Sequence, residues 1–172
     1  TMINKLYSDA TTEGITTKDQ YLNTVEIPAE YYLERGYSKE TLEFFGIGFC
    51  DVPGKQMYQR AIVPIYDDNS QYVVGVSGRS IFNQCSKCNF YHDPKKPCKF
   101  FPKWRHSKGF QKEKWLYNYC NAQPNIRETQ TIVIVESPGN VWRLHEAGVR
   151  NAVAIFGTTL NDSQKAIIDS SG

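Results

Sequence analysis

The stretch that decides the fold is TIVIVESPGN, residues 131–140. Its first five residues are β-branched, and such a run favours a β-strand with both faces buried. Glu136 follows directly, and Ser137, Pro138 and Gly139 then precede a segment with helical character. We therefore predict a fully buried strand that ends in a carboxylate. The question is why a charged side chain ends a strand that otherwise has the composition of a buried one.

The residues after this strand predict a parallel sheet. Residues 140–146 are amphipathic and stop at Gly148, residues 151–157 have strand composition, and residues 161–171 again favour a helix. Strand, helix, strand and helix in succession imply parallel strands with right-handed crossovers. In such sheets, ligands bind beyond the carboxyl ends of the strands. At this end, Glu136 is suited to holding Mg²⁺ or accepting a proton; alternatively, it is a solvated carboxylate that favours the helix start.

The upstream patterns predict short helices and a hairpin. Residues 28–36 begin with proline and end with glycine, and residues 38–46 begin with serine and end with glycine, so each predicts a short helix. Residues 60–81 contain the strand-like runs RAIVPIY and QYVVGVSGRSI around the turn formers DDNS, which predicts a β-hairpin. Residues 1–20 have the composition of a polar arm. Residues 83–128 follow no regular pattern, and we expect a loop-rich insert with connections there.

The overall composition is that of a globular protein. The chain has 172 residues, of which 40% are hydrophobic and 13% aromatic, enough for a sizeable core. No apolar run approaches about 18 residues, so we expect no membrane span. The first residues lack the basic and apolar regions of a secretory signal, and we therefore expect a cytoplasmic location.

The formal net charge of +2 conceals a strongly basic middle third. Residues 79–115 contain ten Lys and Arg but only two acidic residues, together with eight aromatic residues. Cationic side chains neutralise phosphates and aromatic rings stack on bases, so this composition favours a nucleic-acid partner. The alternative is a solvated basic surface whose aromatic residues belong to an ordinary core.

A cysteine-rich segment lies within the basic third and predicts a zinc site. The sequence CSKCNFYHDPKKPC supplies four ligands at knuckle-like spacing: Cys85, Cys88, His92 and Cys98. A Cys-x2-Cys pair presents two thiolates on one turn, and the later His and Cys complete a tetrahedron. We expect structural Zn²⁺ here, with His106 as an alternative fourth ligand. The other interpretation is that these three cysteines are free thiols in a loop. Disulfides are not expected, because the chain has five cysteines, an odd number, and no secretory signal.

The sequence IVIVESPGNVWRLHEAGVRNAVAIFGTTLNDSQ, residues 132–164, resembles the first half of a Toprim domain. Toprim is the metal-binding catalytic fold shared by primases, topoisomerases and some nucleases. Its pattern is a hydrophobic strand ending in Glu, then a helix, then a strand of the NAVA type, and Glu136 matches that glutamate. VESP also resembles the opening of type IA topoisomerases, whereas bacterial replicative primases have Gly and Asp where this chain has Ser137 and Asn140.

The upstream sequence resembles the N-terminal lobe of a bacterial or phage-type DNA primase catalytic core. The resemblance is carried, in order, by YYLERGYSKETLEFFGIGFC, QRAIVPIYDDNSQYVVGVSGRSI, PKWRHS and KEKWLYN. It implies an α+β N-terminal lobe with a β-hairpin and short helices, followed by a partial α/β Toprim unit, which is Rossmann-like with a parallel sheet. The resemblance covers roughly residues 28–172 and leaves the polar arm at 1–20 and the zinc insert at 83–101 outside it. The expected domains are thus the arm, a basic lobe at 21–120 that contains the insert, and the first half of a Toprim domain at 129–172.

This resemblance implies a fragment of a primase, a DNA-directed RNA polymerase that makes short primers on single-stranded DNA from NTPs. It assigns Glu136 to catalytic Mg²⁺ or Mn²⁺ in metal-dependent nucleotidyl transfer. Phosphates of the template or the nucleotide would be contacted by Arg60, Arg79, Lys103, Arg105 and Lys112. A replicative helicase, fused or separate, is a possible partner. Arg60 and Arg79 could instead flank strands at a solvated edge.

A Toprim site also uses an Asp-x-Asp pair after the next strand, and no such pair occurs in this chain. One carboxylate does not assemble a two-metal site, so we expect the 172-residue chain alone to be inactive or nearly so, as a piece of a longer protein. Two alternatives stay open. One is a fragment of a Toprim topoisomerase or nuclease, and the other is a non-catalytic module that binds nucleic acid through the zinc insert and the basic residues.

Overall fold

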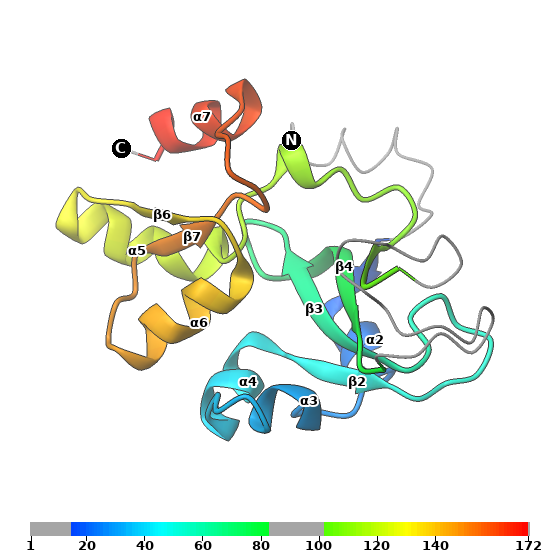
Figure 1. The fold of residues 1–172 in the computed structure, drawn as a ribbon. Coiled ribbons are helices and arrows are strands. Elements are labelled where there is room, and N and C mark those ends of the chain that lie inside the picture. Colours follow the sequence, from blue (N-terminus) through cyan, green and yellow to red (C-terminus); the bar gives the residue numbers. More distant parts are fainter. Residues whose placement is uncertain (1–14, 83–101, 172) are drawn as a thin grey trace.

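The computed structural model describes residues 15–82 and 102–171, which form two β-sheets and the helices packed on them (Figure 1). The larger sheet is antiparallel with the order β1-β4-β3-β2, and β5 also pairs with β4. The smaller sheet pairs β6 with β7 in parallel. The elements in chain order are β1 (Thr16–Thr17), α2 (Lys18–Leu22), α3 (Glu30–Leu33), α4 (Lys39–Phe45), β2 (Gly48–Cys50), β3 (Arg60–Tyr66), β4 (Tyr72–Ser80), β5 (Trp104–His106), η1 (Lys112–Lys114), α5 (Tyr119–Thr129), β6 (Val133–Val135), α6 (Pro138–Glu146), β7 (Ala152–Ala154) and α7 (Asp162–Asp169).

The predicted hairpin is confirmed as β3 and β4, the centre of the larger sheet. Its register runs from the pair Arg60 and Ser80 to the pair Tyr66 and Val73. The turn is fixed by Asp67, whose carboxylate accepts hydrogen bonds from the backbone N–H groups of Gln71 (2.8 Å) and Tyr72 (2.9 Å). Such Asx-type turns are a local signal, which is why the sequence alone indicated the hairpin.

The predicted helix over residues 38–46 is confirmed as α4. Ser38 is its N-cap, with the hydroxyl oxygen accepting from the backbone N–H of Thr41 at 3.1 Å. Gly46 ends the helix in the left-handed region with φ of 68°. A Cβ at this glycine would lie 2.6 Å from the Tyr66 hydroxyl, so both the backbone and the packing require glycine.

The predicted strand–helix–strand unit is also confirmed, and its strands are parallel, with Val133 opposite Ala152 and Val135 opposite Ala154. Helix α6 starts two residues earlier than expected, because Ser137 is the N-cap and Pro138 takes the first helical position. In Figure 1, α6 lies between this sheet and α4, so the unit packs directly against the N-terminal lobe.

Three expectations about local structure were wrong. Strand β6 is not fully buried, because Ile134 is 41% exposed while its neighbours are only half-buried; in the described residues β6 pairs with β7 alone. The region expected to be loop-rich contains the strand β5 and the helix α5, which Pro124 and several polar residues concealed. Residues 16–20 do not belong to an arm, since Thr16 and Thr17 pair with β4 and α2 begins at Lys18.

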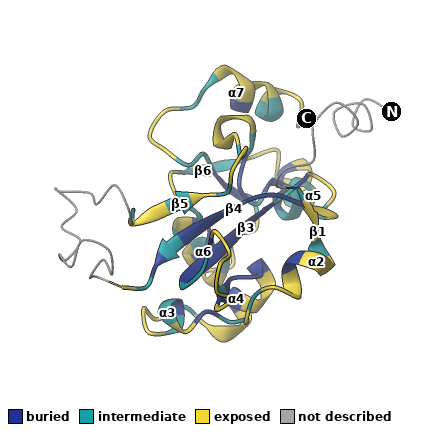
Figure 2. Cartoon of the chain, turned by 90° about the vertical axis from the view of Figure 1, so that its right-hand side faces the viewer, coloured by how far each residue is buried: buried dark blue, intermediate teal, exposed yellow. Residues whose placement is uncertain are grey.

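One hydrophobic core joins the two sheets. It contains Phe45 from α4, Val63 from β3 and Trp142 from α6, and Figure 2 shows β3 and β4 as largely buried strands. Tyr117 links the parts by pairing its backbone with Ala154 of β7, and its hydroxyl accepts from the Trp142 indole N–H at 2.7 Å. The lobe and the strand–helix–strand unit are therefore packed as one body. No helix within residues 15–82 and 102–171 is long and apolar enough to cross a membrane.

Candidate functional site

Glu136 stands at the carboxyl end of the parallel sheet. It directly follows β6 and precedes Ser137, the N-cap of α6, and its side chain is exposed. Because β7 runs parallel to β6, the segment after β7 leaves the sheet at the same end. We call this end of the sheet, with Glu136 and residues 155–157, the carboxylate edge. It is where a sheet of this topology presents a binding site.

The carboxylate edge offers a partial fit to a metal ion. An exposed glutamate supplies an oxygen ligand of the kind that Mg²⁺ and Mn²⁺ prefer. In the part of the chain that the structure describes, however, no group of three Asp, Glu, His or Cys side chains is placed to hold a metal. Glu136 can therefore act as one ligand, and a complete site would need further oxygen ligands.

Ser137 and Asn140, the two departures from the primase pattern, bind each other. The Ser137 hydroxyl donates to the side-chain oxygen of Asn140 at 2.7 Å, and the Asn140 backbone N–H donates to the Ser137 carbonyl at 3.1 Å. They close the first turn of α6 directly after Glu136. The contact between the two side chains is local to this turn, and the Ser137 side chain does not cap a backbone N–H group of α6.

Three of the predicted cations lie in or directly beside two adjacent strands, β4 and β5. Arg79 on β4 is paired with Trp104 on β5, Lys103 comes just before β5, and Arg105 lies within it. Lys103 is exposed and Trp104 is 44% exposed. We name these four residues the basic edge. An exposed indole among cations is the combination that binds single-stranded nucleic acid, through stacking and phosphate contacts.

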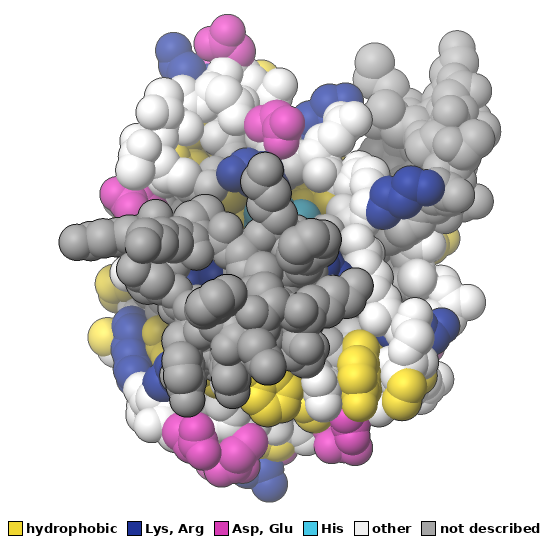
Figure 3. Space-filling model, turned by 45° about the vertical axis from the view of Figure 1, so that its right-hand side comes forward, with side chains coloured by type: hydrophobic (Ala, Val, Ile, Leu, Met, Phe, Trp, Pro, Cys, Tyr) yellow, Lys and Arg dark blue, Asp and Glu magenta, His cyan; other side chains and the backbone are white. Residues whose placement is uncertain are grey.

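The side of the molecule drawn in Figure 3 shows how charges are distributed. Lys and Arg side chains occur across this side, and several Asp and Glu side chains gather near its lower rim. Lys112 lies in η1 and is exposed. Burial lowers the pKa of the His106 imidazole, and the charge of Lys112 acts in the same direction, whereas the charge of Glu113 opposes it. Lys112 is thus an exposed cation that lies next to an acidic residue.

Arg60 is placed differently from the expectation that it contacts phosphates. Its side chain is fully buried, at 0% exposure. Its guanidinium donates to the carbonyl oxygens of Gly78 (3.0 Å), Pro102 (2.9 Å) and Lys103 (3.4 Å). Burial and the nearby positive charges of Arg105 and Arg79 lower its pKa to about 10. We conclude that Arg60 holds the start of β5 against β4 and so supports the basic edge from inside.

Arg35 is a residue that the sequence reasoning missed. Its guanidinium carbon lies 3.4 Å from the centre of the Tyr31 ring, and that of Arg79 lies 5.5 Å from the same ring. Burial raises the pKa of the neighbouring Tyr32, while the charges of Arg79 and Arg35 act in the opposite direction. Two cations thus meet at one aromatic ring, which favours an anion there. Nothing local in YYLERG indicated this, because Arg79 is distant in sequence.

Phe110 connects the basic strands with the carboxylate edge. Its ring packs so closely on Gly75 of β4 that a Cβ at this glycine would lie 2.2 Å from the ring. Its other neighbour is Phe156, after β7, at a centroid distance of 5.8 Å in an edge-to-face arrangement. The basic strands and the end of the parallel sheet are therefore held together by direct aromatic packing.

The four predicted zinc ligands, Cys85, Cys88, His92 and Cys98, lie outside the described residues. The alternative ligand His106 is within them, on β5, and its Nδ1 atom is 2.7 Å from the Ser77 hydroxyl oxygen. One ring nitrogen of His106 is thus already engaged inside the protein. The zinc site stays a prediction from the sequence.

The curated proteins with similar sequences that are described below are DNA primases. Residues 130–170 match the Toprim domain family. The DNA primase of Staphylococcus aureus (strain COL) is 34% identical over 170 residues, which cover 80% of this chain and 26% of that protein. The chain is related to the catalytic core of bacterial DNA primases. It spans about a quarter of the length of the curated primases it matches.

Solved primase structures share this fold. The Aquifex aeolicus primase (zinc binding and RNA polymerase domains) superposes with a TM-score of 0.67 at 21% identity, over 88% of this chain and 43% of that chain. The DnaG primase catalytic domain bound to single-stranded DNA gives a TM-score of 0.66, also at 21% identity, over 89% and 56% of the two chains. The mixed fold with a curled antiparallel sheet and a parallel strand pair is therefore that of a primase core with part of a Toprim domain.

Proposed function

We propose that this chain is part of a DNA primase and that its basic edge binds the single-stranded DNA template. The observation that carries the proposal is the cross-strand pairing of Arg79 with the exposed Trp104, with the exposed Lys103 next to Trp104 and Arg35 beside Arg79. Cations on adjacent strands track a phosphate backbone, and an exposed indole stacks on a base of any sequence. The related structure with bound single-stranded DNA supports this partner for a fold of this type.

The proposed chemistry is the metal-dependent joining of NTPs into a primer, with Glu136 at the carboxylate edge. Bound Mg²⁺ or Mn²⁺ would neutralise phosphate charge and activate the attacking hydroxyl. The contribution of this chain is to hold the template on the basic edge and to present Glu136 as one ligand. The packing of Phe110 between Gly75 and Phe156 keeps the two regions in a fixed relation. A structural zinc in residues 85–98 and a replicative helicase partner belong to the same proposal and rest on the sequence.

The alternative is a non-catalytic nucleic-acid-binding module, and one observation favours it. The described residues supply a single carboxylate at the carboxylate edge, without a metal-binding group. Both functions predict DNA binding, and both predict an inactive 172-residue chain. They are separated by template-directed primer synthesis with a longer protein that contains this chain together with an Asp-x-Asp pair, which only the primase proposal predicts.

The proposed template surface is tested by fluorescence anisotropy of labelled single-stranded DNA over a salt series. Arg79→Ala and Lys103→Ala are compared with Glu136→Gln. We expect both basic variants to weaken binding and to lower the slope of log K against log salt by about 0.7 each, the value for one phosphate contact on a single strand. Glu136→Gln should leave the slope unchanged. Equal slopes for all four proteins would contradict the proposal.

A further inference from the structure

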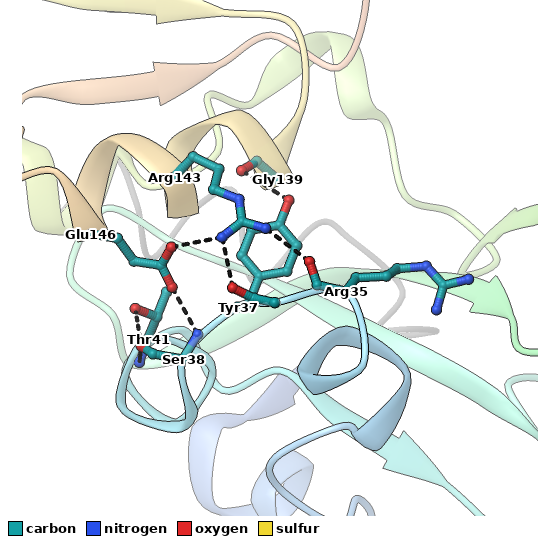
Figure 4. Close-up of polar contacts among 8 residues, drawn as sticks. Arg35, Tyr37, Ser38, Thr41, Gly139, Arg143 and Glu146 are labelled. Atoms are coloured by element: carbon teal, nitrogen blue, oxygen red, sulfur yellow. Dashed lines mark hydrogen bonds and ion pairs between the residues drawn. The ribbon is translucent and has the colours of Figure 1, made fainter.

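Helix α6 is attached to the turn formed by residues 35–38, and Figure 4 shows the contact. Arg143 donates from Nη1 to the carbonyl oxygen of Gly36 (2.8 Å) and to a carboxylate oxygen of Glu146 (3.0 Å). Its Nη2 donates to the carbonyl oxygen of Arg35 at 2.9 Å. Glu146 uses its other oxygen to accept the backbone N–H of Ser38 at 2.8 Å. Two side chains of α6 thus bind the backbone of one turn at three residues, Arg35, Gly36 and Ser38.

The charges of this pair match the backbone groups that they meet. Arg143, a cation, lies at carbonyl oxygens just after α3, where the partial charge is negative. Glu146, an anion, lies at the N–H of Ser38, the N-cap of α4, where the partial charge is positive. Burial acts to raise the pKa of Glu146, but the hydrogen bonds from Ser38, Arg143 and Thr41 lower it overall. The pair is therefore oriented for this turn, and an exchange of the two charges would not fit it.

Aromatic contacts extend the same attachment to the start of α6. The Arg143 guanidinium carbon lies 3.9 Å from the centre of the Tyr37 ring. The Tyr37 hydroxyl donates to the carbonyl oxygen of Gly139 at 3.4 Å, and its ring meets the Trp142 ring edge-to-face at 5.2 Å. Gly139 is three residues from Glu136. The turn is thus in contact with α6 from its first helical turn to its last residue.

The turn also carries Arg35, whose side chain points away from α6 in Figure 4. While its carbonyl oxygen accepts from Arg143, its guanidinium lies on Tyr31 beside Arg79. A displacement of the backbone at Arg35 would therefore move one of the two cations at Tyr31. The contact to α6 and the proposed template surface share this residue.

We propose that Arg143 and Glu146 form a latch that positions Arg35 for the template and fixes the turn relative to α6. The inference rests on the proposed function, because the position of Arg35 affects DNA binding only if the surface that Arg35 forms with Arg79 contacts the template. Both act through Arg35 and are positioning residues. Neither Arg143 nor Glu146 needs to touch DNA for this role.

The exposure of the pair separates this role from a contribution to stability. The side chains of Arg143 and Glu146 are 48% and 23% exposed, and exposed ion pairs contribute little to folding. The core residues Val141 and Trp142 of the same helix are buried and hold α6 in place without the latch. Loss of the pair should therefore leave the protein folded while releasing the turn.

Glu146→Ala gives the sharpest test, because the two explanations predict opposite signs. Removing a negative charge near bound DNA strengthens binding by simple electrostatics. If the latch positions Arg35, Glu146→Ala instead weakens single-stranded DNA binding, by about threefold to tenfold. Glu43→Ala is the matched control, since Glu43 forms an exposed ion pair with Lys39 on α4 and has no contact with the turn backbone in the described contacts. We expect no weakening by Glu43→Ala. Unchanged or tighter binding by Glu146→Ala would overturn the latch.

A second set of variants shows whether the latch acts through Arg35. In an Arg35→Ala background, Arg143→Ala should have no further effect on DNA affinity, because the group that it positions is gone. The exchanged pair Arg143→Glu with Glu146→Arg should bind DNA as weakly as Arg143→Ala, since glutamate cannot donate to the two carbonyl oxygens. Full additivity with Arg35→Ala, or rescue by the exchanged pair, would contradict the proposal.

Hydrogen exchange measures the latch without DNA. In Glu146→Ala, which removes the acceptor of the Ser38 N–H, the Ser38 amide should exchange at least about fivefold faster than in the wild type, at an unchanged melting temperature. Unchanged exchange of Ser38 would show that the latch does not hold the turn and would overturn the inference. If the wild-type chain binds DNA but the latch variants behave like the wild type, the inference alone fails. If the wild-type chain binds no DNA, the proposed function fails, and the positioning role fails with it.

Discussion

Replacing Arg60 with Met separates a structural role for this arginine from a role in binding DNA. Methionine keeps much of the length of the side chain but cannot donate to the carbonyl oxygens of Gly78, Pro102 and Lys103. These oxygens are at the junction of β4 with the start of β5. The variant therefore removes the contribution of the Arg60 side chain to holding β5, whereas the backbone pairing of β5 with β4 and the exposed cations of the basic edge remain.

The expected loss of stability follows from these contacts. A hydrogen bond from a charged donor contributes about 1.5–3 kcal/mol, and a buried carbonyl left without a partner costs about 1–3 kcal/mol. The gain from no longer burying a cation, visible in the pKa of Arg60 lowered to about 10, offsets part of this loss. We expect a net destabilisation of about 2–4 kcal/mol, which corresponds to a fall in melting temperature of about 5–15 °C for a chain of this size.

The assay combines thermal unfolding with DNA binding at low temperature, where both proteins are folded. Arg60→Met should unfold earlier, but the slope of log K against log salt should equal that of the wild type, because no phosphate contact is lost. Arg127→Met is the matched control, since Arg127 is exposed on α5 and its guanidinium donates one described hydrogen bond, to the side chain of Gln123 at 3.1 Å. We expect it to unfold at the wild-type temperature. If Arg60→Met has unchanged stability and a slope lower by about 0.7, the structural role of Arg60 is wrong and Arg60 contacts a phosphate directly.

Three further predictions concern the core, the response to acid pH and the half-buried thiol of Cys120. Trp142→Phe removes the indole N–H that donates to the Tyr117 hydroxyl and should destabilise the protein by about 2–3 kcal/mol in thermal or urea unfolding. The pKa of Glu146 is lowered in the folded protein, so the stabilisation that its carboxylate gives the turn is present above the ordinary carboxyl pKa and is lost as pH falls through the lowered value. The exchange rate of the Ser38 amide, corrected for its intrinsic pH dependence, should therefore rise only in that acid range. Burial raises the pKa of Cys120 to about 11, so iodoacetamide at pH 8 should label it about a hundredfold more slowly than an exposed cysteine, as measured by peptide mass spectrometry.

Local signals explain why much of the fold could be predicted from the sequence. Ser38 and Gly46 specify the two ends of α4 through contacts within a few residues, and Asp67 specifies the hairpin turn in the same way. The parallel unit followed from alternating strand and helix patterns, and it placed Glu136 at the carboxyl end of β6. Helix α5 was not predicted because Pro124 lies within it, although Tyr119, Ala122 and Ile126 have the spacing of a buried helical face.

The residues of the candidate site were predicted from the resemblance to primases. Arg79 and Lys103 lie in the matching motifs QYVVGVSGRSI and PKWRHS. The burial of Arg60 depends on carbonyl groups more than forty positions away, at Pro102 and Lys103, and no local pattern records such contacts. The same holds for the latch, in which Arg143 meets residues more than a hundred positions upstream.

The burial of β6 shows a related limit. Five β-branched residues indicate a strand, but they do not indicate how many neighbours the strand has. In the described residues β6 pairs with β7, and Ile134 stays 41% exposed on one face. Residue type therefore identified the element, whereas its burial depended on packing that the pattern does not contain.

If the basic edge binds a single-stranded template, Trp104 stacks on a base. Photo-crosslinking of DNA that contains 5-iododeoxyuridine, followed by peptide mass spectrometry, tests this contact directly, because the reagent joins to aromatic side chains within stacking distance. The main crosslinked peptide should contain Trp104, and Trp104→Ala should abolish this crosslink while the protein remains folded. A main crosslink at Phe44, which is 52% exposed on α4 and outside the basic edge, with none at Trp104, would show that the template does not bind at the basic edge.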